Sequence, residues 1–595
     1  MNAASPQEAI QRAWTRLQQD TAIPEVLALV ADITAGQPQF AQAQHIRGVC
    51  AAREGDPGRA KALLIDAIRH GDQSTGVWLG LASAAAAIDF PDDALAMLLD
   101  LLKRISTPQL FPFAVQLLRV LGFASKERRP QKDLAFSKLL IPILAALLAR
   151  RDMDNAIAFE GLLYEHYVKP TETEAHFAWC MEKIEPLFTQ AAHAWRDELP
   201  PLPQAELTRP YRIGFFIHNA STLAHIEVLL NTLKGYRMLD EQPFEPTVYC
   251  FSGKSPEMEQ ALARLDVRLV MLNELSPETG ASAWRRLLRL RELISEDGVQ
   301  ELVWVSLVTL LPLAFGLRLA PVQTWLAMKY RNFSQPDIDG YVTGSALTRF
   351  ATLCGRRWRM GMLGVDDWYD PALEEAATAI RASQDAPVVL MTLARTEKMQ
   401  DPAYLAAMVA VLKAHPQVLF LWAGREQSPA IVKAFREGGV LEQTRFIGWV
   451  NTRLFAQVAD IFLDTFPFPC GFTLFQAMAA AKPVVIYDSP EAAQTGLWAF
   501  LKPLVEDGEG TPEERAELHA FMGGDADPLI SLARTPEAYV ALASRLIKDA
   551  DARTAAGGAS QRFMAHYFSD PRVLGVSLGR HFVELIEAKR RGEPV

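Results

Sequence analysis

Cysteine is scarce in this sequence, and the five cysteines stand far apart along its 595 residues. None belongs to a CxxC pair, so neither a disulfide framework nor a zinc site is indicated. Basic residues are fewer than acidic ones, 60 against 70, and the net charge is −10 at pH 7. This balance argues against nucleic acid or an anionic membrane surface as the partner.

Leader-like and membrane-spanning segments are also missing. The N-terminus has neither a basic segment nor an apolar core, so no secretory signal is predicted. The longest apolar run, Leu302–Leu317, contains Ser306, Thr309 and Pro312. These residues favour a strand followed by a helix over a membrane span. The sequence therefore predicts a soluble, cytoplasmic protein without a membrane span.

What is present is ample core material, because half of the residues are hydrophobic. The length predicts three or four domains. Residues 1–205 have an almost purely helical pattern. Small and apolar residues recur there at a spacing of about 34 residues, the period of a tetratricopeptide hairpin: Gly48, Ala60 and Leu64 are followed by Ala82, Ala94 and Leu98. Such repeats commonly hold peptides; the alternative is a helical cap on the next domain.

After the proline-rich joint Leu199–Pro203 the pattern changes to alternating strands and helices. We expect one doubly wound α/β domain at residues 206–375 and a second at 376–565. Residues 566–595 are expected to form a C-terminal helix that packs back on the first domain. The expected strands of the first domain are Tyr211–Ile217, Pro246–Ser252, Val267–Leu272, Leu302–Val308, Gln323–Met328 and Gly340–Thr343.

The stretch Asp460–Tyr487 organises the second domain. The apolar run Ile461–Asp464 predicts a buried strand, Phe472–Ala481 a helix, and Val484–Tyr487 the next strand. The helix would begin just after a glycine-ended loop, and free N–H groups at a helix start bind anions. A phosphate group is therefore expected at Gly471–Thr473. The alternative is an ordinary α/β turn that binds nothing.

Two further loops are expected at the same edge of the second sheet, where ligands bind in such folds. They are Leu393–Gln400, which carries Arg395 and Lys398, and Gly424–Ser428, which carries Arg425. Their cations and the glycine turn strengthen the prediction of a phosphate site. For Arg425, a solvated surface charge is an equally good interpretation.

Several motifs of the second domain resemble the bacterial cytoplasmic glycosyltransferases that modify high-molecular-weight adhesins, relatives of the O-GlcNAc transferases. The similarity lies in TLARTEKMQDPAYLAAM (392–408), FLWAGREQSPAIVKAF (420–435) and LDTFPFPCGFTLFQAM (463–478). Weaker matches are MKYRNFSQPDIDGYV (328–342) and HYFSDPRVLG (566–575).

The resemblance implies a GT-B fold: two facing Rossmann-like lobes, here preceded by an all-α domain. It implies a metal-independent, inverting enzyme that transfers a hexose from UDP-glucose or UDP-GlcNAc. The acceptor would be a side chain, Asn or Ser/Thr, of an adhesin, a flagellin or another surface protein. Lys398 matches the lysine that holds the donor pyrophosphate, where an ammonium offsets charge on the leaving group. The loop positions and the resemblance together give the predicted donor-side residues, which are Arg395, Lys398, Gly424, Arg425, Gly471, Phe472, Thr473 and Gln476.

Two donor-side positions depart from the family pattern. Phe472 stands where the family has an asparagine, and Gln476 stands where it has an aspartate for the ribose hydroxyls. A glutamine still forms hydrogen bonds there, but without the strengthening effect of a charge. These departures leave the sugar and full activity open.

The first lobe is expected to supply the acceptor side. His218 and Asn219 end its first strand and His225 opens its first helix, so either histidine is a candidate general base. Histidines in such places are often only surface or capping residues. Gln335 lies in the segment that resembles the family's second acceptor-side region.

Two functions therefore remain open on the sequence. One is the UDP-sugar-dependent protein glycosyltransferase, which Lys398, the FPF segment of the loop (Phe466–Phe468) and the two histidines favour. The other is a helical-repeat interaction module whose transferase domain is degenerate and not catalytic, which Phe472 and Gln476 favour.

Overall fold

The computed structural model describes residues 5–123, 130–169, 174–202, 209–220, 223–253, 255–328, 332–344, 350–364, 368–487, 512, 531–568 and 570–593. Residues 329–331 and 569 of the sequence motifs, and Pro203 of the proline-rich joint, lie outside this set. Contacts divide the chain into two compact units. The first is Met1–Leu199 with Ser282–Trp284, and the second is Pro200–Ala281 with Arg285–Val595.

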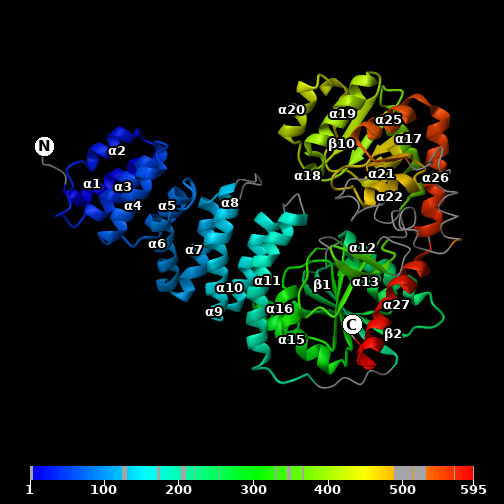
Figure 1. The fold of residues 1–595 in the computed structure, drawn as a ribbon, viewed down its shortest axis with the longest axis horizontal. Coiled ribbons are helices and arrows are strands. Elements are labelled where there is room, and N and C mark those ends of the chain that lie inside the picture. Colours follow the sequence, from blue (N-terminus) through cyan, green and yellow to red (C-terminus); the bar gives the residue numbers. More distant parts are fainter. Residues whose placement is uncertain are drawn as a thin grey trace. The chain divides into compact units, whose positions relative to one another are not determined.

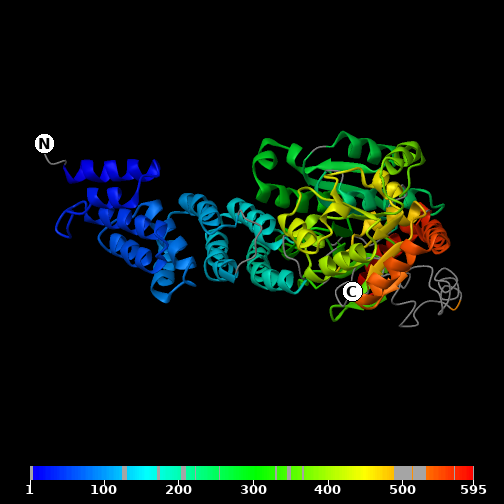
Figure 2. The ribbon, with the colours of Figure 1, turned by 90° about the horizontal axis from the view of Figure 1, so that it is seen from above.

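The first unit is all helical (Figure 1, blue to cyan). Neighbouring helices form hairpins, and Leu64 packs directly against Gly48 where α3 meets α4. Figure 2 shows the first of these helices side by side. The helices are α1 Pro6–Gln18, α2 Ile23–Leu29, α3 Phe40–Arg53, α4 Pro57–Arg69, α5 Thr75–Ala86, α6 Asp92–Arg104, α7 Thr107–Val120, α8 Pro130–Ala135, α9 Ile141–Ala149, α10 Met153–Leu163 and α11 Glu174–Arg196.

The first lobe of the second unit contains an eight-stranded sheet, in the order β3-β2-β1-β4-β5-β6-β8-β7. All pairs are parallel except the β7–β8 hairpin, which the sequence analysis did not predict. The strands are β1 Tyr211–Asn219, β2 Phe244–Ser252, β3 Arg268–Met271, β4 Glu301–Val305, β5 Val322–Ala327, β6 Gly340–Gly344, β7 Phe350–Leu353 and β8 Arg356–Gly361.

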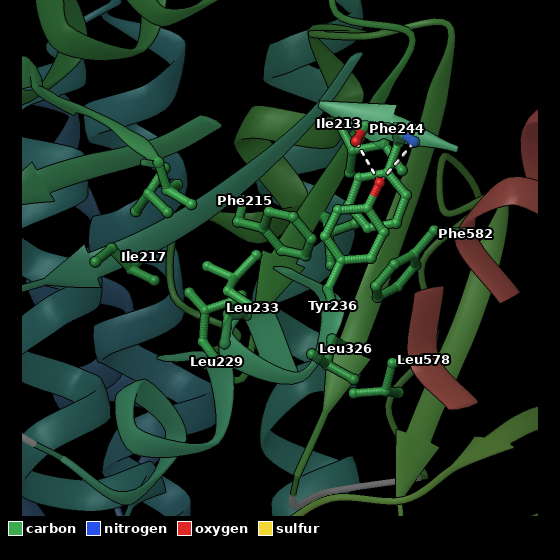
Figure 3. Packing of buried hydrophobic residues seen from close by; sticks show 14 of the residues in the cluster. Ile213, Phe215, Ile217, Leu229, Leu233, Tyr236, Phe244, Leu326, Leu578 and Phe582 are labelled. Carbon is green, nitrogen blue, oxygen red and sulfur yellow. Dashed lines mark hydrogen bonds between the residues drawn. The ribbon is translucent and has the colours of Figure 1, made fainter. Parts of the chain in front are cut away.

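One face of this sheet carries the core shown in Figure 3. Tyr236 of α12 (Ala224–Arg237) stacks on Phe244 with ring centroids 3.9 Å apart, and its hydroxyl accepts a hydrogen bond from the N–H of Phe244 at 2.8 Å. Phe582 and Leu578 complete the cluster from α27 (Pro571–Arg590). The remaining helices of this lobe are α13 Pro256–Arg264, α14 Pro277–Ala281, α15 Ala283–Glu296 and α16 Leu311–Gly316.

The second lobe contains a six-stranded parallel sheet, in the order β11-β10-β9-β12-β13-β14. Buried strands and helices form one apolar cluster on each face. The strands are β9 Val389–Leu393, β10 Leu419–Ala423, β11 Thr444–Phe446, β12 Ile461–Leu463, β13 Val484–Tyr487 and β14 Ser531–Ala533. The helices are α17 Glu374–Ala382, α18 Thr396–Met399, α19 Pro402–Ala414, α20 Pro429–Glu437, α21 Thr452–Val458, α22 Phe472–Ala479 and α25 Pro536–Lys548.

The last two helices divide between the lobes. Helix α26 (Ala550–Phe568) packs on α22 and α25 of the second lobe, whereas α27 packs on α12, β5 and β8 of the first. The crossing of α12 and α27 is so close that a side chain on Gly235 would overlap the backbone at Pro571, and one on Gly575 would overlap the backbone at Tyr236. The C-terminal end of the chain therefore belongs to the core of the first lobe.

Candidate functional site

The second sheet changes direction between β9 and β12. From β9 the chain runs outward to β10 and β11, then returns to β12 on the other side of β9. Loops at the carboxyl ends of strands diverge at such a point and leave room for a ligand. The two loops that flank it carry Lys398, after β9, and Gly471–Thr473, after β12. They are linked, because the Thr473 hydroxyl donates to the carbonyl oxygen of Leu393 at 2.7 Å.

Helix α22 begins at this point. Its N-cap residue, Gly471, has φ 77° and ψ −125°, a backbone conformation open to glycine and strained for other residues. The N–H groups of a first helical turn have no partner within the helix, and the helix dipole favours an anion beside them. The structure thus places Gly471, Phe472 and Thr473 at a helix start, as the sequence predicts.

Gln476 lies one turn further along α22 and is only 9% exposed. Its Oε1 finds no hydrogen-bond partner among the described residues. A buried amide oxygen without a donor costs about 1–3 kcal/mol. A buried acceptor of this kind is normally satisfied by a hydrogen-bond donor, and Gln476 presents it one turn from the start of α22.

Lys398 lies in the short helix α18, directly beside the β12–α22 loop. Its Nζ donates a hydrogen bond to the carbonyl oxygen of Pro469. Burial lowers the pKa of Lys398; the nearby thiol of Cys470 and carboxyl of Asp464 counteract this shift, and Arg395 adds to it. One side chain therefore brings a cation to the loop that precedes the helix start.

The loop between β12 and α22 is folded over Asp464, which is 1% exposed. The Asp464 carboxylate accepts the N–H of Thr465 at 2.9 Å and that of Cys470 at 2.6 Å. Burial raises the pKa of Asp464 to about 6, and burial also raises the pKa of Cys470 to about 12. From the sequence alone, Asp464 is predicted only to end a strand, and no role follows for it.

The loops after β10 and β11 are tied together at the same edge. Gly424, which is buried, donates its N–H to the carbonyl oxygen of Gly448 at 3.1 Å. Arg425 is exposed, and its guanidinium lies 5.5 Å from the ring centroid of Trp449, which is 72% exposed. Arg395 is exposed at the N-cap of α18. The arginines therefore stand at the rim, not in the buried part of the site.

Phe472 has a different environment from its neighbours in the loop. Its ring meets that of Trp368 edge-on at 5.2 Å, and it packs against the apolar clusters of both lobes. An apolar side chain is satisfied in this position, where an asparagine would need polar partners. The half-buried side chain of Phe472 thus packs on apolar neighbours, while its backbone N–H belongs to the first turn of α22.

His218 and His225 come together at the carboxyl edge of the first sheet. His218, the last residue but one of β1, is half-buried, and its ring centroid lies 5.4 Å from that of Phe251. His225 lies in the first turn of α12, and burial together with the charge of His218 lowers its pKa to about 4. His225 is therefore neutral at neutral pH, and the pair carries at most one positive charge under those conditions.

Asn219 and Gln335 differ in position. Asn219 is exposed at the end of β1, and its amide oxygen closes over Gly253, where an added Cβ would lie 2.5 Å from it. Gln335 is buried, and its side chain is engaged in its own loop: its Nε2 donates to Asp337 Oδ2 at 2.8 Å, and its Oε1 accepts the N–H of Asp337 at 2.9 Å. The backbone carbonyl oxygen of Asp337 in turn accepts a hydrogen bond from Nε2 of Gln323, at the start of β5. Gln335 is thus held toward the opposite edge of the sheet from the histidines.

Within the described residues no group of three or more potential metal ligands is found. Over the same residues, no helix has both the length and the apolarity that a bilayer crossing requires.

Two sheets that are parallel apart from the β7–β8 hairpin, with a C-terminal helix that crosses between the two lobes, form the GT-B class of fold, and an N-terminal helical region precedes them, as the sequence predicts. Residues 387–513 match the family model described as Glycosyl transferases group 1. The chain thus carries a glycosyltransferase group 1 domain, and the matched segment contains the donor-side residues of the candidate site but neither His218 nor His225. A search of the curated proteins finds no match.

Solved structures are similar over much or all of the chain. A lysine-to-methionine mutant of Thermobaculum terrenum O-GlcNAc transferase aligns at 16% identity with a TM-score of 0.52, over 99% of this chain and 100% of that one. A glycosyltransferase from Rickettsia africae aligns at 15% identity with a TM-score of 0.43, over 64% of this chain and 100% of that one. Pneumococcal O-GlcNAc transferase GtfA, in complex with UDP and GlcNAc, aligns at 8% identity with a TM-score of 0.39, over 64% of this chain and 100% of that one.

Proposed function

We propose that this protein is a UDP-sugar-dependent glycosyltransferase that moves a hexose, glucose-like or N-acetylated, onto an Asn or Ser/Thr side chain of a protein in the cytoplasm. The group 1 domain at residues 387–513 and the GT-B fold support a glycosyltransferase. The solved GtfA complex contains UDP and GlcNAc, which supports a UDP-sugar as donor. The proposed reaction inverts the sugar carbon and uses no metal.

The observation that carries this proposal is the orphaned Oε1 of Gln476 beside the start of α22. In the proposed complex the donor diphosphate lies at the N–H groups of Phe472 and Thr473, and Lys398 neutralises charge on it. A ribose hydroxyl donates to Gln476 Oε1. One ligand then meets the helix start, the cation and the buried acceptor together. Arg395 and Arg425, at the rim, add to the positive field.

On the acceptor side, the proposed general base is the pair His218–His225. Because the pKa of His225 is near 4, a proton taken from the acceptor resides on His218, and His225 remains a neutral hydrogen-bonding neighbour. Asn219 lies next to His218 and is proposed to orient the acceptor. Gln335 is too engaged in its loop to contribute, and we assign it no direct contact with substrate.

The donor assignment is tested by nucleotide-dependent thermal stability. Saturating UDP is expected to raise the melting temperature of the full chain, because a ligand that binds only the folded state stabilises it by mass action. ADP and GDP should give much smaller shifts. Equal shifts with all three nucleotides would remove the uridine assignment.

The second candidate is an interaction module with a degenerate transferase domain. It is favoured by the apolar packing of Phe472 and by the neutral Gln476 at positions where the resembling family has polar or charged side chains. Slow hydrolysis of UDP-glucose or UDP-GlcNAc by the purified protein distinguishes the two, since only an active site cleaves the donor. Binding of UDP without any cleavage or transfer would favour the module.

A further inference from the structure

The buried carboxyl of Asp464 stands out because the fold bears a cost to keep it charged. It is 1% exposed, and burial raises its pKa to about 6, so at neutral pH it is ionised inside the protein. An ionised buried group destabilises a fold unless its surroundings compensate. Such an expensive charge next to a candidate site points to a role in function.

The hydrogen bonds of Asp464 show what it holds. Its carboxylate binds the N–H groups at both ends of the loop Thr465–Cys470, and the Tyr539 hydroxyl donates to its backbone carbonyl oxygen at 2.8 Å. The loop ends directly before Gly471, so the carboxylate fixes the position of the α22 start. The same loop carries the carbonyl oxygen of Pro469, to which Lys398 donates.

The charges around Asp464 identify its partner. The titratable groups that face it are Lys398 on α18, Cys470 in the loop, Tyr404 on α19 and Tyr539 on α25. Cys470 and both tyrosines have pKa values raised by burial and are neutral at pH 7. Lys398 is thus the cation among the groups that face Asp464. Within the described residues, no direct ion pair joins Lys398 to Asp464.

We propose that Asp464 is a positioning residue, the counter-ion that keeps the Lys398 ammonium charged and the loop 465–470 closed beneath the donor diphosphate. In the empty site the carboxylate balances the ammonium across the loop. When the diphosphate binds, its oxygens become the nearer anions, and Lys398 contacts them without any change in its protonation. This inference rests on the proposed donor site and assigns the residue that prepares it.

The test is the alkaline limit of UDP binding, measured by titration calorimetry between pH 7 and pH 11. Binding by wild type should weaken as Lys398 loses its proton. Asp464→Asn keeps an acceptor oxygen for the two N–H groups but removes the charge, so the pKa of Lys398 falls. The alkaline limit should move down by about one pH unit. A loss of structure alone would weaken binding at every pH and leave the limit in place.

Two other variants calibrate this experiment. In Lys398→Arg the guanidinium does not lose its proton in this pH range. Any loss of UDP affinity at high pH in this variant is therefore caused by titration of the nucleotide. Asp401→Asn, at the half-buried N-cap of α19, keeps a capping oxygen and should leave the limit where wild type has it. An unshifted limit in Asp464→Asn that binds UDP overturns the inference and leaves the donor site standing. Absence of UDP binding by wild type overturns both.

A reciprocal measurement needs no nucleotide and serves if Asp464→Asn does not fold. Lys398→Met removes the cation, which should raise the pKa of Asp464 above its wild-type value. Because that pKa is raised on folding, stability falls as pH rises toward it. In Lys398→Met the melting temperature should therefore continue to fall at higher pH than in wild type. Parallel pH profiles for the two proteins would refute the coupling.

Discussion

Gln476 offers a test in which stability and binding should change in opposite directions. Replacing Gln476 with Met keeps the length of the side chain and removes the amide oxygen that has no donor. Removing an unsatisfied buried acceptor should stabilise the second lobe by about 1–2 kcal/mol. In a domain of this size, each kcal/mol of added stability raises the melting temperature by about 2–4 °C. UDP affinity should fall about tenfold, the loss of one good hydrogen bond.

Gln457 provides the matched control in the same lobe. It is also 9% exposed, but its Nε2 donates to the carbonyl oxygen of Asp370 at 2.9 Å. Gln457→Met should therefore lower the free energy of unfolding by roughly 1 kcal/mol, and with it the melting temperature. It should leave UDP affinity unchanged. Differential scanning calorimetry and UDP titration on both variants provide the comparison. A destabilised Gln476→Met would show that the amide oxygen already accepts a hydrogen bond within the protein. The proposed contact between a donor ribose and Gln476 would then be refuted.

Three further predictions follow from other parts of the second unit. Lys398→Ala should reduce transfer by about 2–4 kcal/mol of transition-state stabilisation with an unchanged circular dichroism spectrum; an unaltered rate would contradict its role. Gly575→Ala should destabilise by about 1–3 kcal/mol in a urea titration because its methyl group meets the backbone of Tyr236. Gly558→Ala in α26 should stabilise by up to about 1 kcal/mol, because its methyl group meets only the flexible end of the Arg562 side chain, at 3.3 Å. Glu301 is fully buried, and burial raises its pKa well above the ordinary value. The stability of the wild-type protein therefore falls as pH rises above that ordinary value. Glu301→Gln should flatten the profile of melting temperature against pH between pH 5 and 8.

The fold class was predictable because apolar runs mark buried parallel strands strongly. Expected and observed strands agree closely, for example Leu302–Val308 against Glu301–Val305 and Ile461–Asp464 against Ile461–Leu463. The β7–β8 hairpin was missed. Its strand Arg356–Gly361 is half arginine, and its apolar residues Trp358 and Met360 alternate over too short a span to indicate a strand by themselves.

The candidate site could be predicted only where backbone geometry determines it. A glycine before a buried helix indicates an anion site, and the structure places Gly471 at the start of α22. The side-chain environments could not be read in this way. Whether Phe472 faces a ligand or the core depends on Trp368, which is remote in sequence. The role of Asp464 depends on a loop that folds back over it, and a single acidic residue at a strand end does not indicate that.

The crossing of the last helix into the first lobe has a consequence for how the chain folds as it is synthesised. The first sheet is complete once residue 361 has left the ribosome, but Leu578 and Phe582, which cover it, follow more than two hundred residues later. Until then Phe244 and Tyr236 have an open apolar face beside them. Because domains fold in order of synthesis and exposed apolar faces aggregate, the nascent first lobe depends on rapid completion of the chain or on chaperone protection. A truncation at the end of α26 would make that exposure permanent.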